Sequence, residues 1–507
     1  MSDTGQLHGN ADVLPRAAAR RPWPASSGER VKRLAHEHRL LLGLLAAGAA
    51  VRLLSMILYS SVVLIYYGGD STRYARLAVS GYHGLFSDPD SPAGYPAFLG
   101  VARSIDRNIA FTITLQHLMG LATAVFLYAI VRGLTRSNAW ACLPAAVVLL
   151  SGDVVFLETA LLTETLWMLL LAAGMWACVN ARGRRRPYSW LCAGAVLLSL
   201  AGLVRSLSLP LIVLAALWAL WEIGGGWRRR VGVAACFLAP AAILLGSYAL
   251  VASAENGYAG LSDMSGFNLY ARVGQFADCS DFTPPRGTAG LCESTPSSKR
   301  PGPYFYTYGQ NAPMYRAGFG ADPASSKKLG EFADEAILNQ PGEYLAAVIK
   351  DLGRYIAPDA IVARPDSGIG PPGMSFASAS PANQGQSPAQ LAGDFDTAYS
   401  GVSASVPSQG VRELLGGYQE VLRLNGFLVV LLTVTAAAGL LLGRGASRRA
   451  GLLFLLMGLY LYIVPVALSS YDVRYGVPAG MFMAVSAALA ACSITARVRE
   501  RRSREVS

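Results

Sequence analysis

The chain alternates between apolar runs of about twenty residues and short polar connections. A helix rises 1.5 Å per residue, so a run of that length matches the hydrocarbon thickness of a bilayer. Ten runs predict membrane-spanning helices: 40–66, 110–131, 138–152, 156–180, 189–204, 207–223, 231–253, 424–443, 450–468 and 476–496. The pattern therefore predicts an all-α polytopic membrane protein with about ten transmembrane helices.

One further apolar stretch is too short to cross a bilayer. Residues 91–105 begin with Ser-Pro-Ala-Gly-Tyr-Pro and continue with about twelve apolar-leaning residues, which predicts an interfacial helix. A second short helix is expected over 72–80. Both would lie along the membrane surface in the first outer loop, 67–109.

Charge follows the same alternation. The 507 residues are 53% hydrophobic and 15% charged, with a formal net charge of +11. The arginines form short clusters in alternate loops, at 132–136, 182–186, 228–230, 444–449 and 497–504. By the positive-inside rule these loops and both termini are cytoplasmic, which predicts a multi-pass protein of the cytoplasmic membrane. If residues 91–105 crossed the membrane, Arg132 would lie on the outer side and the charge pattern would be broken. The clustering also argues against a nucleic-acid partner.

The composition divides the chain into five parts. Residues 1–38 are basic and rich in Gly, Ser, Pro and Ala, typical of a disordered cytoplasmic tail. Membrane parts are expected over 39–253 and 424–496, with a basic cytoplasmic tail over 497–507. Between the membrane parts, 254–423 is a polar extracytoplasmic insert that leans towards helix. In it, 361–408 is typical of a flexible loop.

The insert also holds a helical pattern from Glu331 to Ile356. Its predicted buried stripe consists of Phe332, Ala336, Ile337, Tyr344, Val348, Leu352 and Tyr355. Cys279 and Cys292 are the two cysteines of the insert, and no metal-ligand spacing is formed. They are expected to form a disulfide if the insert faces an oxidising compartment. The other five cysteines lie in apolar runs, as small hydrophobes.

Asp70 follows the first span, in the stretch Tyr66-Tyr67-Gly68-Gly69-Asp70-Ser71-Thr72-Arg73-Tyr74. Glycines allow a sharp turn there, and Asp70 stands at the start of a short helix. The residue is predicted to be the N-cap of that helix, a catalytic base, or both, since one carboxylate can serve as cap and base. If it is only a cap, Glu164, Asp88 or Asp90 are the alternative catalytic acids.

Other ionisable residues lie near the outer ends of spans, where charges tend to face a cavity or a partner. Glu158 and Glu164 fall in the first turns of the predicted 156–180 helix, with Glu164 roughly 10 Å below its start. Glu164 is either a hydrogen-bonded structural acid or part of a site. Arg52, inside the first span, either pairs with an acid such as Glu164 or extends towards the interface.

Two arginines could bind phosphate, since the guanidinium group donates two parallel hydrogen bonds. Arg205 interrupts the turn between the fifth and sixth spans and could instead anchor to lipid headgroups. Arg474, in Tyr471-Asp472-Val473-Arg474-Tyr475, could instead form a local ion pair with Asp472. A divalent cation site at His83, Asp88 and Asp90 matches no ligand motif, so no metal ligands are assigned.

The order of an apolar span, Asp70, Tyr74 and then the Ser91-Pro92-Ala93-Gly94-Tyr95-Pro96 stretch resembles integral-membrane glycosyltransferases of the GT-C class. The similarity is greatest to the branch of protein O-mannosyltransferases and lipid A aminoarabinose transferases. Thr163-Glu164 and Arg474-Tyr475 resemble pairs that open the fourth and final helices in that class. The insert departs from the family pattern, which leaves the acceptor open.

The resemblance implies a polyprenyl-phosphate-linked sugar as donor, no nucleotide sugar, and a single inverting displacement by a hexosyl- or pentosyltransferase. Asp70 is implied as the catalytic base. The implied donor-binding residues are Arg73, Tyr74, Glu164, Arg205, Arg474 and Tyr475. The acceptor would be a glycan, lipid or protein. A transporter or lipid flippase is the alternative function and a non-catalytic scaffold a third, although a transporter site usually lies at the midplane between repeats, which this chain lacks.

Overall fold

The computed structural model describes residues 27–59, 69–378, 393, 395–403 and 407–506. Within them, eight helical stretches are long and apolar enough to cross a membrane, and the bent pair α7–α8 makes nine if it counts as one span. The tenth predicted span corresponds to α9, a shorter apolar helix. The helices are α2 (Arg39–Tyr59), α6 (Ile109–Thr135), α7 (Asn138–Leu150), α8 (Gly152–Thr159), α9 (Glu164–Asn180), α10 (Pro187–Val204), α11 (Leu209–Ile223), α12 (Trp227–Asn256), α20 (Gly426–Leu442), α21 (Gly445–Leu468) and α22 (Val473–Val506). The predicted all-α membrane class is confirmed.

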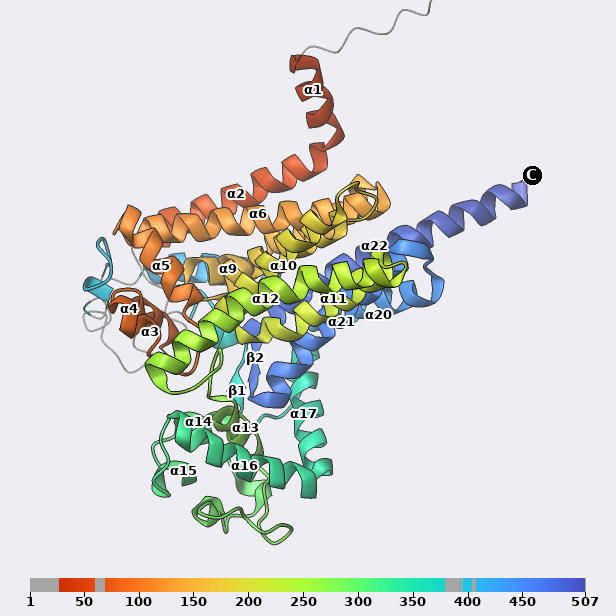
Figure 1. The fold of residues 1–507 in the computed structure, drawn as a ribbon. Coiled ribbons are helices and arrows are strands. Elements are labelled where there is room, and N and C mark those ends of the chain that lie inside the picture. Colours follow the sequence, from red (N-terminus) through yellow and green to blue (C-terminus); the bar gives the residue numbers. More distant parts are fainter. Residues whose placement is uncertain (1–26, 60–68, 379–392, 394, 404–406, 507) are drawn as a thin grey trace, which may run out of the picture.

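The spans run side by side in one bundle, with the insert at one end (Figure 1). We call this the insert end. Helix α22 packs against α20, α21 and α7, and is the most buried of the spans. Small residues allow close approach: a Cβ on Gly439 would lie 2.3 Å from the Cβ of Ala490 on α22. Such contacts between small residues are the usual way in which membrane helices pack.

The third and fourth spans differ from the prediction. Helix α8 bends by 49° relative to α7, and the chain leaves helical geometry at Ala160 before α9 begins at Glu164. The Gln116 side-chain amide of α6 donates to the carbonyl oxygens of Glu158 (2.9 Å) and Ala160 (2.8 Å), which satisfies backbone groups at the break. The predicted 156–180 helix was therefore wrong at its start. Glu158 belongs to α8, and Glu164 is the first residue of α9 rather than a residue about two turns inside it.

The first loop holds α3 (Asp70–Leu77), α4 (Gly81–Leu85) and α5 (Gly94–Ile105), close to the predicted helices over 72–80 and 91–105. Helix α5 has 12 residues. A Cβ on Gly94 would lie 2.3 Å from the carbonyl oxygen of Leu203, so only glycine lets α5 approach the end of α10 this closely. This contact fixes the first loop beside the turn that carries Arg205. The predicted residues Tyr66, Tyr67 and Gly68 lie outside the described part of the chain.

The insert is helical, as predicted. It comprises α13 (Ser265–Gly274), α14 (Pro303–Tyr308), α15 (Pro313–Arg316), α16 (Pro323–Asn339), α17 (Pro341–Ile356) and α19 (Gln409–Val421), with short 3₁₀ turns η2 (Ala289–Leu291), η3 (Ser297–Lys299) and η4 (Pro371–Met374). Phe332 and Ala336 of the predicted stripe are buried in its core. Pro341 divides the predicted continuous pattern into α16 and α17. The predicted Cys279–Cys292 disulfide is confirmed.

Two predicted unstructured segments are partly ordered. Within 361–408, strand β1 (Gly368–Ile369) pairs in parallel with β2 (Tyr471–Asp472), which directly precedes α22. Met374 and Phe376 are also fully buried, so packing orders this part of the predicted loop. In the tail 1–38, Ser27–Glu37 forms helix α1, and residues 1–26 lie outside the described part. The pair β1–β2 ties the insert to the end of α21 and the start of α22 (Figure 1).

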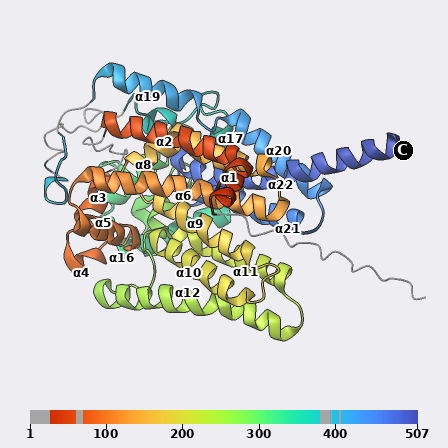
Figure 2. The ribbon, with the colours of Figure 1, turned by 90° about the horizontal axis from the view of Figure 1, so that it is seen from above.

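Seen from above, α19 lies along the side of the bundle near α2, whereas α12 lies at the opposite edge (Figure 2). The first loop, with α3 to α5, lies at the insert end of α2 and α6. The termini of α9 and α22 that carry Glu164 and Arg474 face this same end. Residues from both halves of the sequence therefore meet there.

Candidate active site

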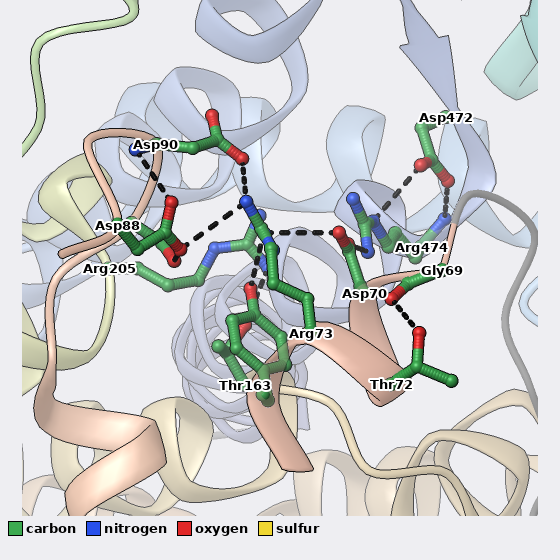
Figure 3. Close-up of polar contacts among 12 residues, drawn as sticks. Gly69, Asp70, Thr72, Arg73, Asp88, Asp90, Thr163, Arg205, Asp472 and Arg474 are labelled. Atoms are coloured by element: carbon green, nitrogen blue, oxygen red, sulfur yellow. Dashed lines mark hydrogen bonds and ion pairs between the residues drawn. The ribbon is translucent and has the colours of Figure 1, made fainter. Parts of the chain in front are cut away.

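Asp70 is the first residue of α3, and its side chain does not cap the helix. Gly69 occupies the N-cap position with φ of 77°, a left-handed conformation that glycine adopts without strain, and no side chain caps the helix. The Asp70 carboxylate instead accepts hydrogen bonds from Arg474 Nη1 (2.7 Å) and Arg73 Nη2 (3.1 Å), as Figure 3 shows. The interpretation of Asp70 as a cap is therefore wrong.

The charges around Asp70 set its protonation. Burial by itself would raise the pKa of this carboxyl, but Arg474 and Arg73 outweigh burial and hold the pKa below its usual range. Asp70 is therefore ionised at neutral pH. It joins the first loop to the last span, since Asp70 and Arg474 are 404 positions apart in the sequence.

Arg474 lies in the first turn of α22, where it contacts three carboxylates. Besides Asp70, its Nε lies 3.0 Å from Asp472 Oδ2 and 3.7 Å from Glu164 Oε1. The local pair with Asp472 that the sequence left open is present, together with the contact to Asp70. Tyr475 follows directly, with the Arg474 guanidinium 5.2 Å from its ring centroid.

Arg205 follows the end of α10 and reaches across to the start of α9. Its Nη1 donates to the hydroxyl of Thr163 (3.1 Å) and forms an ion pair with the fully buried Glu164. The guanidinium group lies 5.2 Å from the ring centroid of Trp167 and 5.0 Å from that of Tyr475. Among the described residues, no hydrogen bond uses its Nε or Nη2, although its side chain lines the cavity described below. These N–H groups remain able to bind a ligand.

Arg73 is the third cation of the site. It contacts Asp90 and, at 3.4 Å, Asp88, on the turn before α5 (Figure 3). Tyr74, its neighbour, is buried and packs edge-to-face on Tyr95 of α5, with ring centroids 5.2 Å apart. These contacts hold α3 against α5.

His83, which is close to Asp88 and Asp90 in the sequence, contacts a different carboxylate. His83 Nδ1 lies 2.6 Å from Glu255 at the end of α12. Across the described ranges, no three His, Cys, Asp or Glu side chains are placed to hold a metal ion. Asp88 and Asp90 are instead occupied by Arg73.

A cavity of about 260 Å³ lies between these groups. The predicted residues Asp70, Arg73, Tyr74, Arg205, Arg474 and Tyr475 line it, and Glu164 stands directly behind Arg205 and Arg474. The structure thus brings all seven predicted site residues together, from α3, α9, the α10–α11 turn and α22.

The insert supplies a wall of this cavity that the sequence did not reveal. Asn268 of α13 and Tyr304, Thr307 and Tyr308 of α14 line it. The rings of Tyr304 and Tyr308 are 4.5 Å apart, and the Tyr308 side chain is still largely exposed. No motif marks these residues, and a Tyr-x-x-x-Tyr spacing on one helix face was the only available signal.

Arg52 belongs to a separate network inside the bundle. Its Nη2 lies 2.7 Å from Glu158, and His117 Nδ1 lies 2.8 Å from the other oxygen of the same carboxylate. All three side chains are almost completely buried. Arg52 therefore has an acidic partner, as one of the two alternatives held, but the partner is Glu158 and not the suggested Glu164. The break before α9 places Glu158 at this depth instead.

Comparison with known proteins yields structural matches only. No family model and no curated protein sequence matches the chain. The fold is similar to the Saccharomyces cerevisiae protein O-mannosyltransferase Pmt1–Pmt2 complex (18% identity, TM-score 0.34) and to the Archaeoglobus fulgidus oligosaccharyltransferase AglB (14%, 0.41). It is also similar to ArnT of Cupriavidus metallidurans (13%, 0.34), solved with undecaprenyl phosphate. All three are GT-C membrane glycosyltransferases, the class that the sequence resembles.

The matches differ in extent. They cover 43%, 92% and 93% of this chain, and 33%, 51% and 78% of Pmt1–Pmt2, AglB and ArnT respectively. The chain therefore spans a third to about half the length of the first two proteins. At these identities the likeness concerns the fold, and a reaction has to be inferred from the site itself.

Proposed function

We propose that the chain is a glycosyltransferase that moves a sugar from a polyprenyl-phosphate donor to an acceptor hydroxyl. The observation that carries this proposal is the cavity at the insert end of the spans, where the Asp70 carboxylate pairs with Arg73 and Arg474 and a third arginine, Arg205, lines the same space. Transfer from a lipid-linked sugar phosphate needs a cation for the phosphate and a base for the acceptor. Guanidinium groups at the membrane surface bind the phosphate, and a carboxylate beside the anomeric carbon takes the proton of the acceptor hydroxyl.

Arg205 is the proposed phosphate ligand. Its Nε and Nη2, which make no hydrogen bond within the described part of the chain, can donate two parallel hydrogen bonds to phosphate oxygens. Glu164 and the rings of Trp167 and Tyr475 fix the guanidinium plane. The phosphate is the leaving group, so its charge grows as the glycosidic bond breaks. Donors fixed in advance stabilise that developing charge without reorganising.

Asp70 is the proposed general base. In the reaction, its carboxylate takes the proton of the acceptor hydroxyl while the acceptor oxygen forms a bond to the anomeric carbon. The bond from that carbon to the phosphate oxygen breaks, and the phosphate leaves with the electron pair. Attack opposite to the leaving group inverts the anomeric centre.

The ion pair between Asp70 and Arg474 gives the donor a role in activating the base. Without donor, the arginines hold the pKa of Asp70 low, which makes it a weak base. A bound phosphate places negative charge beside the same arginines and raises the pKa of the carboxyl. Asp70 thereby becomes a stronger base when a donor is present.

The site is proposed to face the extracytoplasmic side, with both termini cytoplasmic. The arginine-rich loops at the opposite end of the bundle and the disulfide of the insert support this orientation. A nucleotide sugar is then not the donor. The wall formed by Tyr304, Tyr308 and Asn268 suits a sugar ring, since aromatic faces and amides bind its C–H and O–H groups.

The proposal is tested with the purified protein in lipid nanodiscs. Polyprenyl phosphates that carry different radiolabelled sugars are added, and release of free polyprenyl phosphate with label in a new product is measured. Donor-dependent formation of a glycosidic bond supports the proposal. If labelled donor crosses proteoliposome membranes intact and no bond is cleaved, the protein is a flippase instead.

A further inference from the structure

A second and larger cavity, of about 730 Å³, lies next to the candidate active site. The pair β1–β2 separates the two. Ile369 and Asp472 line the active-site cavity, whereas Tyr471 and Pro371 line the second one. Because neighbouring residues of a strand point to opposite faces, a wall one strand thick divides the cavities.

The floor of the second cavity is apolar and belongs to the membrane spans. It consists of residues at the insert ends of α7, α8, α20, α21 and α22: Val147, Val148, Val154, Val429, Tyr462, Val473 and Val477. Val429 lies three residues inside α20, about 4.5 Å below its start. Val429 therefore places part of the floor within the first turn of a span.

The rim of the cavity is polar and carries carboxylates. Glu413 and Glu420 come from one face of α19, and Asp359 follows the end of α17. All three are exposed, and of these Glu413 accepts a hydrogen bond from Gln409 (2.7 Å). No ion pair to any of the three is formed within the described ranges. The rim therefore has a negative potential.

The two arginines of the lining are already engaged. Arg423 binds Asp153 through Nε (3.0 Å) and Nη2 (3.0 Å). Arg354 donates to the carbonyl oxygen of Ser367 (3.1 Å) and stacks on Tyr471, 4.1 Å from its ring centroid. This lining would repel a phosphate, in contrast to the cavity that holds Arg205.

We propose that the second cavity binds a lipid-like molecule that has an apolar chain and a headgroup with hydroxyl or amino groups and no phosphate. Its chain lies on the valine floor, and its headgroup binds the carboxylates of α19 and Asp359. The volume is in the range of small-molecule sites, which are mostly apolar with a few polar groups that fix orientation. The site is distinct from the proposed donor site and does not depend on sugar transfer.

Gly417 offers a direct test, because it lines the cavity between Glu413 and Glu420 and an added Cβ would meet nothing within 4 Å. Gly417→Trp should place an indole ring in the cavity, because the backbone leaves open space around the new Cβ. Gly410→Trp is the matched control: it lies on the same helix, also in open space, and outside the lining.

The probes are a single-chain alkyl glucoside and a phosphatidylglycerol, each with a photoreactive diazirine, added to the full-length protein in nanodiscs. Peptides that contain the floor residues are quantified by mass spectrometry. We expect saturable labelling by the glucoside, competed by unlabelled alkyl glucoside, and a decrease of about tenfold in Gly417→Trp but not in Gly410→Trp.

Three results would overturn the proposal: labelling that no competitor reduces in the wild type, equal labelling in both tryptophan variants, or preferential labelling by the phosphatidylglycerol. A thermal unfolding profile of each variant shows whether it folds. If Gly417→Trp does not fold, the competition experiment with the wild type still tests whether the second cavity binds the alkyl glucoside.

Discussion

Replacement of Arg205 by lysine tests the proposed phosphate site most selectively. Lysine keeps the charge, but its single ammonium group cannot donate to Thr163 and Glu164 and also present two parallel N–H groups to a phosphate. One charge-assisted hydrogen bond contributes about 1.5–3 kcal/mol. Loss of one such bond should therefore raise the Kd for polyprenyl phosphate by roughly 10- to 150-fold.

The assay is calorimetric titration of polyprenyl phosphate without sugar into the protein in nanodiscs, which separates binding from transfer. Arg103→Lys is a suitable control, because Arg103 binds the carbonyl oxygen of Ala398 and lies outside the lining of the cavity. The control should bind as the wild type does. An unchanged Kd in Arg205→Lys would refute the assignment and leave Arg205 as a structural partner of Glu164.

Three further outcomes are expected. Glu158→Gln should lower the free energy of unfolding by about 3–5 kcal/mol, because it leaves the Arg52 charge buried without a counter-ion. Adding Arg52→Met to the same chain should restore much of this stability, and thermal unfolding in detergent measures the single and the double variant. The pKa of Asp70 is lowered in the folded state, so its ion pairs stabilise the fold at pH values above the unfolded-state pKa of about 4, and this contribution is lost as the pH falls through the folded-state pKa. The difference in melting temperature between the wild type and Asp70→Asn should therefore vanish in acid. A difference that stays constant with pH would contradict this prediction. On intact cells, a membrane-impermeant maleimide should label Cys279 and Cys292 only after reduction. Labelling without a reductant would exclude the disulfide. Labelling only after cell lysis would exclude the proposed orientation.

The sequence was most informative where a residue's position depends on span boundaries alone. Asp70, Arg205 and Arg474 each lie at the insert end of a span, and apolar run length and loop charge were enough to place them on one side. Helices that end at the same membrane surface bring such residues to a common depth. Their lateral proximity could not be read from the same signals.

Failures occurred where distant contacts decide local structure. Asp70 has the residue type of a cap, but Arg474 draws its carboxylate away and Gly69 starts the helix. The break between α8 and α9 depends on the Gln116 amide from another helix, so the apolar run from 156 to 180 gave no sign of it. The partner of Arg52 was mistaken for the same reason.

The aromatic wall of the cavity was missed for a different reason. Tyr304 and Tyr308 lie in a polar insert that is held against the membrane part by contacts of α13 and α17 with the spans and by the short pair β1–β2. Two residues per strand are too few to give a periodic signal in the sequence. The contribution of the insert to the site therefore appears only in three dimensions.

The central claim is that Asp70 acts as the base in transfer from a lipid phosphate donor. The most direct test measures donor binding and transfer in the same preparation of Asp70→Asn. An amide cannot take up a proton, so transfer should fall by at least about 10². The variant also removes a negative charge that competes for Arg474 and Arg73, so it should bind polyprenyl phosphate as tightly as the wild type or more tightly. Near-normal transfer by a folded Asp70→Asn would contradict the account and direct the search for the catalytic acid to Glu164, Asp88 or Asp90.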